Sequence, residues 1–158
     1  MNISDCISRI RSSIHDISGE YTDAECLAFL NDAVQETAVL LASLRYSPLI
    51  AETVLTEGDA LPSNYIADVG VHPYRLTAGR VHLLDALSSL KLRYYVAPAP
   101  LTISDTLPFT PLFDEVILLA ATIRALRRNE YDTSAEESQL TSLRQALALS
   151  LGEKGGRP

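Results

Sequence analysis

Apolar residues recur at helical spacing in four parts of this chain, residues 3–17, 22–44, 111–129 and 133–151. In each part they follow one another mostly at three- and four-residue steps, which places them on one face of an α-helix. The four apolar stripes are Ile3, Ile7, Ile10, Ile14 and Ile17; Leu27, Leu30, Val34, Leu41 and Leu44; Leu112, Val116, Leu119, Ile123 and Leu126; and Leu140, Leu143, Leu147 and Leu151. The pattern therefore predicts four helices, each with a buried face.

Local signals support the ends of these helices. The stretches 22–25 (T-D-A-E) and 133–136 (T-S-A-E) have the spacing of a capping box, in which a hydroxyl and a carboxylate each accept a backbone N–H at the helix start. Thr110 followed by Pro111 is typical of an N-cap and first helical position, and Gly19 is a typical helix stop. Because short connections join the first helix to the second and the third to the fourth, we expect two antiparallel hairpins.

Between the two hairpins, in residues 47–100, the pattern changes from helical to alternating. In residues 90–96, Leu90, Leu92, Tyr94 and Val96 face one way and the intervening side chains face the other, which predicts a half-buried strand. Residues 50–56 predict a second strand, while 69–71 and 81–83 are weaker candidates. The middle of the chain is therefore expected to form a small antiparallel sheet.

The predicted fold is mainly α, in the α+β class. It is a four-helix bundle of two antiparallel hairpins with a small antiparallel β insertion between them. We expect a single domain over residues 1–151, followed by a flexible C-terminal tail over residues 152–158.

The third helix is apolar on more than one face. Phe113, Ile117 and Ala121 lie outside its main stripe, and a helix that is apolar all round is usually buried. Two partners are open for this surplus surface, the isoleucine stripe of the first helix and a neighbouring subunit. The three residues are therefore also candidates for a subunit interface.

Composition indicates an ordinary globular protein of about one domain, with 158 residues, 47% of them hydrophobic and 21% charged. No apolar run approaches the roughly 18 residues of a membrane span, and the first residues lack the features of a signal peptide, so we expect no membrane association. Cys6 and Cys26 are too few for a disulfide framework, so a reducing compartment such as the cytosol is expected.

The net charge of −7 argues against a nucleic-acid-binding surface, which gains affinity from clustered basic residues. Arg124, Arg127 and Arg128 form the only dense basic cluster, and they close the third helix. Positive charge at that end complements the helix dipole. A phosphate-binding role is the less favoured alternative.

No catalytic or metal-binding pattern stands out. The three histidines are not spaced with Cys, Asp or Glu as zinc ligands are, and neither a Gly-rich phosphate loop nor a G-x-S-x-G elbow occurs. A Ser-His-Asp triad is not local in sequence and stays open. Asp114 and Glu115 could act as catalytic carboxylates, but acidic residues in a first helical turn ordinarily complement the dipole. We therefore expect no enzyme, no cofactor and no metal site.

Four motifs, in this order, resemble the head–tail adaptor (connector or head-completion) proteins of tailed bacteriophages. They are residues 27–36 (L-A-F-L-N-D-A-V-Q-E), 61–65 (L-P-S-N-Y), 93–102 (R-Y-Y-V-A-P-A-P-L-T) and 107–115 (L-P-F-T-P-L-F-D-E). The resemblance extends over about residues 20–151, although residues 67–89 match no pattern of that family.

The resemblance implies a structural protein of the virion neck, assembled in the host cytoplasm. Such an adaptor binds the portal protein ring, extends the DNA channel and docks the next tail component, such as a stopper or nozzle. It implies a homo-oligomeric ring of about twelve copies, through which double-stranded DNA passes without tight binding. The net acidic composition is compatible with that role, because like charge keeps the duplex from adhering to the wall.

Two segments are candidates for contact with the portal or a neighbouring subunit. The candidate residues are His72, Pro73, Tyr74 and Arg75 in a loop, and Gly152, Lys154 and Arg157 in the predicted tail. The loop offers an aromatic ring and a guanidinium, which are enriched at interface hot spots, although an ordinary solvated loop fits equally well. The alternative function is a cytosolic helical protein–protein interaction module with a regulatory role, which binds its partner in the groove between the hairpins.

Overall fold

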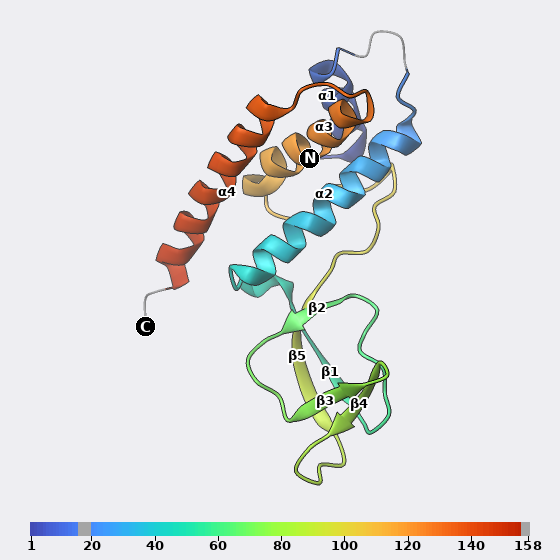
Figure 1. The fold of residues 1–158 in the computed structure, drawn as a ribbon, viewed down its shortest axis with the longest axis vertical. Coiled ribbons are helices and arrows are strands. Elements are labelled where there is room, and N and C mark those ends of the chain that lie inside the picture. Colours follow the sequence, from blue (N-terminus) through green and yellow to red (C-terminus); the bar gives the residue numbers. More distant parts are fainter. Residues whose placement is uncertain (16–19, 156–158) are drawn as a thin grey trace. The chain divides into compact units, whose positions relative to one another are not determined.

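A computed structural model describes the backbone of residues 1–15 and 20–155 and the side chains of residues 1–15 and 20–151. The chain forms two compact units (Figure 1). The helical unit comprises Met1–Thr37 and Pro100–Pro158, and the β-rich unit comprises Ala38–Ala99. Helix α2 (Asp23–Ser43) contributes residues to both units.

The helical unit is built around α3 (Asp114–Arg128), which follows a short 3-10 turn, η2 (Pro111–Phe113). Helix α3 packs against α1 (Ile3–Ser13) and α4 (Ser134–Gly155). The core contains apolar residues from all of these helices, and it includes Ile3, Cys6, Ile7, Ile10, Leu30, Val34, Phe113, Val116, Ile117, Ala120, Ala121 and Leu140.

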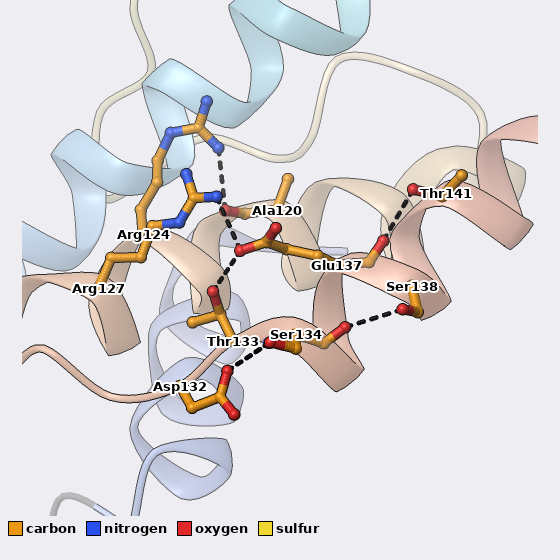
Figure 2. A network of polar contacts seen from close by, with 9 residues as sticks. All are labelled: Ala120, Arg124, Arg127, Asp132, Thr133, Ser134, Glu137, Ser138 and Thr141. Carbon is orange, nitrogen blue, oxygen red and sulfur yellow. Dashed lines mark hydrogen bonds and ion pairs between the residues drawn. The ribbon is translucent and has the colours of Figure 1, made fainter.

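The predicted helix starts are confirmed only in part, and the side chain of Thr110 makes no capping hydrogen bond. Thr22 N–H donates to Glu25 Oε2 at 2.9 Å and Glu25 N–H donates to Thr22 Oγ1 at 3.2 Å, so the first predicted capping box is confirmed. The second is wrong, because the hydroxyl of Thr133 donates to Glu137 instead of pairing with Glu136. Asp132 completes this start by accepting the backbone N–H of Ser134 at 3.0 Å (Figure 2).

The β-rich unit contains five strands in two antiparallel sheets. The strands are β1 (Ile50–Leu55), β2 (Tyr65–Asp68), β3 (Tyr74–Thr77), β4 (Arg80–Leu83) and β5 (Leu90–Val96), and β1 follows a 3-10 turn, η1 (Ser47–Leu49). One sheet has the order β1-β5-β2, and β3 pairs with β4 in the other. Leu55, Val81, Leu92 and Tyr94 from both sheets form one buried cluster.

The alternation predicted for the last strand is confirmed from Leu90 to Tyr94 and fails at Tyr95, which is also buried. Leu90, Leu92 and Tyr94 are buried, whereas Lys91 and Arg93 are exposed and both pair with Glu52 on β1. Between β3 and β4, Ala78 and Gly79 both have positive φ angles, of 50° and 75°. Two positive φ angles in a two-residue loop match the twist of a hairpin, so this turn closes the β3–β4 pair tightly.

The predicted four-helix bundle of two antiparallel hairpins with one small β insertion is wrong. Residues 38–99 are not a decoration on a bundle, because their strands pack on one another and bury a core of their own. The isoleucine stripe of α1 packs on α3, so α1 and α2 do not form the expected hairpin. Helix periodicity shows which face is buried but does not show which element covers it.

Two helix ends also differ from the prediction. Helix α1 ends at Ser13, where residues up to 17 were expected, and Ile17 and Gly19 lie outside the described residues. Helix α4 continues to Gly155, past the predicted start of a tail at residue 152. Within the described part of the chain, no helix is long and apolar enough to cross a membrane.

Candidate functional site

A groove of about 710 Å³ lies in the β-rich unit, between the end of α2 and strand β2. Residues 66–71 line one side of it, and Val39, Ala42, Ser43 and Arg45 line the other, with Tyr95 also contributing. Val39 is 56% exposed and Val71 is 98% exposed. Strand β2 is at the edge of its sheet. We call this feature the α2–β2 groove.

Arg45 is presented to this groove by the way α2 ends. The N–H of Tyr46 donates to the carbonyl of Leu41 at 2.9 Å and the N–H of Arg45 donates to that of Ala42 at 3.0 Å. These two bonds form a Schellman motif, whose left-handed position usually carries glycine. Arg45 occupies that position with a φ of 59°. The chain therefore holds a cation in a backbone conformation that disfavours it.

The charges of the groove are not equally available. Asp68 accepts hydrogen bonds from the hydroxyls of Tyr65 at 3.0 Å and Tyr74 at 3.0 and 3.1 Å. Burial and this carboxylate raise the pKa of Tyr74, so its hydroxyl stays a donor. Among the described residues, by contrast, no ion pair or hydrogen bond engages the side chain of Arg45. The uncommitted charge of the groove is therefore positive.

A second exposed apolar feature of the β-rich unit is the loop between β4 and β5. Leu84 and Leu87 are each 40% exposed, and Asp85 and Ala86 between them have φ angles of 59° and 54°. The loop is anchored where Leu84 N–H donates to the carbonyl of Pro73 at 2.9 Å. We call residues 84–87 the leucine tip. Consecutive left-handed residues that are not glycine are strained, and such strain persists where the structure around it holds it in place.

Net charge is divided unevenly between the two units. Residues 38–99 contain five basic and five acidic residues, so the whole net charge of −7 belongs to the helical unit. The basic side chains there are largely committed to carboxylates. Arg124 and Arg144 both pair with Glu36, at 2.5 and 2.6 Å, and Arg11 pairs with Asp23 at 2.8 Å.

The same holds for the rest of the basic cluster at the end of α3. Arg127 pairs with Glu137 at 2.8 Å, as Figure 2 shows, and Arg128 pairs with Glu25 at 2.9 Å. Because each guanidinium already has a carboxylate partner, the cluster is poorly suited to bind phosphate, and ion pairing between helices accounts for it better than the dipole alone.

A smaller groove of about 370 Å³ lies over α3 in the helical unit. Leu118, Leu119 and Leu126 supply apolar wall, and Glu115 and Arg9 are among its polar lining residues. These half-buried leucines are the surplus apolar surface of α3. The sequence places Leu118 outside the main stripe of α3, but it was not among the candidate contact residues, and Leu119 and Leu126 were assigned to the buried stripe.

The three candidate interface residues, Phe113 in η2 and Ile117 and Ala121 in α3, do not line this groove. Phe113, Ile117 and Ala121 are at most 1% exposed, in the core of the helical unit. These three side chains are therefore covered by other parts of the same chain and not by a neighbouring subunit. We therefore do not propose them as subunit contacts.

The candidate loop residues 72–75 lead into and begin β3. Tyr74 is committed to Asp68, and the ring of His72 lies 3.3 Å from the carbonyl of Arg93. Pro73 is half-buried, and Arg75 is exposed on β3. Arg75 is therefore the one residue of this set that offers a charged group to a partner. The side chains of Gly152 and Lys154, and all of Arg157, lie outside the described residues.

Groups with catalytic potential do not form a constellation in the described part of the chain. Asp114 is 8% exposed and its Oδ2 lies 3.4 Å from the amino group of Met1, while Glu115 is exposed. Burial raises the pKa of the Cys6 thiol to about 11, so it is protonated and unreactive at neutral pH. No cluster of three or more His, Cys, Asp or Glu residues in the described ranges could hold a metal ion.

No protein-family model and no curated protein matches this chain. The geometry of its surfaces must therefore carry the functional argument.

Proposed function

We propose that this chain is a structural adaptor of the virion neck, which binds the portal ring, extends the DNA channel and docks the next tail component. The observation that supports this most is the uneven division of net charge between the two units. All of the net negative charge belongs to the helical unit, and the exposed apolar groove and leucine tip belong to a neutral β-rich unit.

The acidic unit suits a channel wall. Duplex DNA carries a dense negative charge and binds wherever unpaired Lys and Arg residues release its counterions. In the helical unit the arginines of α3 face carboxylates instead. A surface of this kind lets DNA pass without retaining it.

The neutral unit suits protein contacts. The α2–β2 groove exposes apolar side chains in a concave site next to Arg45, whose charge has no partner among the described residues. Such a combination is typical of a protein-binding surface. Arg75, exposed on β3, is the residue we assign to the portal contact, because arginine is enriched at interface hot spots.

The proposal is tested by mixing the full chain with its cognate portal rings and measuring sedimentation velocity. We expect the portal boundary to move to a larger sedimentation coefficient and to carry the chain with it. Arg75→Glu should weaken this binding, whereas Arg9→Glu, an equal charge change at an exposed site of α1, should not. A portal boundary that is unchanged at saturating chain would overturn the proposal.

A regulatory protein–protein interaction module is the second candidate, and the groove over α3 favours it. Its leucines could receive one apolar face of a partner helix. If this function is correct, the chain does not bind portal rings and the portal boundary keeps its sedimentation coefficient. The same sedimentation experiment therefore distinguishes the two candidate functions.

A further inference from the structure

We propose that copies of this chain associate head to tail, with the leucine tip of one copy seated in the α2–β2 groove of the next. If the chain is a ring-forming adaptor, these are the surfaces that join neighbouring copies within the ring, and in this respect the inference rests on the proposed function. The contact itself is derived from two features of the β-rich unit.

The two surfaces are chemically complementary. The groove exposes Val39 and Val71 beside the unpartnered guanidinium of Arg45. The tip exposes Leu84 and Leu87 on either side of Asp85, and no hydrogen bond or ion pair within the described residues engages that carboxylate. Seating the leucines against the valines would bring Asp85 toward Arg45. In such an interface the apolar contact supplies affinity, and the ion pair at its border fixes the register of the two surfaces.

Both charged residues occupy strained backbone positions. Arg45 and Asp85 each have a φ of 59° although neither is glycine, and Ala86 follows at 54°. Glycine would suit each position better for folding alone. Strain alone does not single out these two residues, because His15, Ala78 and Glu130 also have positive φ angles, so the pairing rests on the chemical complementarity of the two surfaces.

The leucine tip and the α2–β2 groove are two different surfaces of one copy. The segment that joins β4 to β5 lies at the end of the β-rich unit remote from β2 (Figure 1). Because the contact joins two different surfaces, it is heterologous, so it repeats from copy to copy and closes into a ring when the rotation allows.

Disulfide trapping tests the contact directly in the full chain. Copies that carry Val71→Cys are mixed with copies that carry Leu87→Cys under oxidising conditions, at the highest concentration at which both stay soluble. The native Cys6 and Cys26 are fully buried and do not interfere. We expect a cross-linked dimer in the mixture and not in either variant alone. Val54→Cys, at an exposed valine outside the groove, replaces Val71→Cys as the control and should give none.

Charge reversal supplies the second readout. Arg45→Glu or Asp85→Arg alone should weaken self-association, measured by sedimentation equilibrium, roughly five- to tenfold, and the double variant should restore it. Arg9→Glu should leave it unchanged. Absence of the mixed cross-link, a dominant Val71→Cys homodimer, or a double variant no better than the singles would each overturn the inference. Portal binding of the unmodified chain is measured separately, so failure of this contact and failure of the adaptor function give different results.

Discussion

At the scale of single residues, the unusual feature is the number of left-handed positions held by residues other than glycine. Three of them, His15, Arg45 and Glu130, directly follow helices. An L-amino acid costs about 1–2 kcal/mol in this region relative to its usual conformations. We assign a binding role to Arg45 and Asp85 and none to Glu130, so the strain at these positions can be tested independently of binding.

Glu130→Gly should stabilise the chain. The N–H of Glu130 donates to the carbonyl of Arg127 at 3.1 Å and that of Tyr131 to Leu126 at 3.2 Å, which is the Schellman geometry that glycine fits best. We expect the free energy of unfolding, measured in urea, to rise by about 1 kcal/mol. Gln145→Gly, at an exposed position in the middle of α4, should lower it by a similar amount, and a loss of stability in Glu130→Gly would contradict the strain argument.

Burial also separates residues that the sequence places on the same helix. Ile117→Ala should cost about 2–5 kcal/mol of unfolding free energy, because it leaves a cavity in a fully buried site. Leu112→Ala should cost less than about 1 kcal/mol, because that side chain is 56% exposed. Thermal unfolding of the two variants measures the difference, and equal losses would contradict the assigned burial.

That contrast shows where sequence reasoning fails at this scale. Leu112 begins a regular apolar stripe, yet it is exposed, whereas Val116 of the same stripe and Ile117 outside it are both buried. The helix is apolar on so many faces that periodicity alone does not choose among them. The choice is made by α1 and α4, whose positions are tertiary and leave no local signal.

At the scale of elements, charged side chains tie the helices of the helical unit together. Glu36 on α2 receives Arg124 from α3 and Arg144 from α4. Burial alone would raise the pKa of Glu36, but the two guanidiniums outweigh it and lower that pKa below the ordinary value. One carboxylate thus joins three helices.

This network should make stability depend on pH. A carboxyl whose pKa is lowered by folding contributes fully above its unfolded value of 4.5 and loses the contribution as pH falls through the folded value. Glu36→Gln should therefore cost about 1–2 kcal/mol at neutral pH, since it leaves two guanidiniums without their partner.

The difference in unfolding free energy between the two proteins should shrink as pH falls below 4.5. Urea unfolding at several pH values measures it, with Glu115→Gln, an exposed acid without an ion pair, as the control. A difference that stays constant down to strongly acidic pH would contradict the network.

The sequence predicts some strands of the β-rich unit well and others poorly. Residues 90–94 alternate because one face of β5 is buried, and the strand predicted over 50–56 nearly coincides with β1. Strand β2 and the β3–β4 hairpin were hard to see, because their residues are mostly half-buried or exposed and give weak alternation. The leucine tip and the α2–β2 groove depend on how these weak strands fold, so neither surface could be found from the sequence.

At the scale of the whole molecule, net charge is divided unevenly between an acidic helical unit and a neutral β-rich unit. Composition gave the total charge but not its division, because the units interleave in sequence and α2 belongs to both. The resemblance to phage adaptors supplied the functional hypothesis. The uneven division of net charge between the two units now supports it on physical grounds.

The acidic unit should have no measurable affinity for duplex DNA. With a net charge of −7 and its main arginine cluster paired, the chain has few free cations with which to displace counterions. Fluorescence anisotropy of a labelled duplex should show no binding at physiological salt. Saturable binding under those conditions would contradict a non-adhesive channel wall.

The most direct test of the adaptor function is a cryo-electron microscopy reconstruction of portal rings mixed with this chain. The account predicts an additional ring coaxial with the portal, with the helical unit at the channel wall and neighbouring copies joined through the leucine tip and the α2–β2 groove. A portal without added density, or a chain bound off the axis with its helical unit away from the channel, would contradict it.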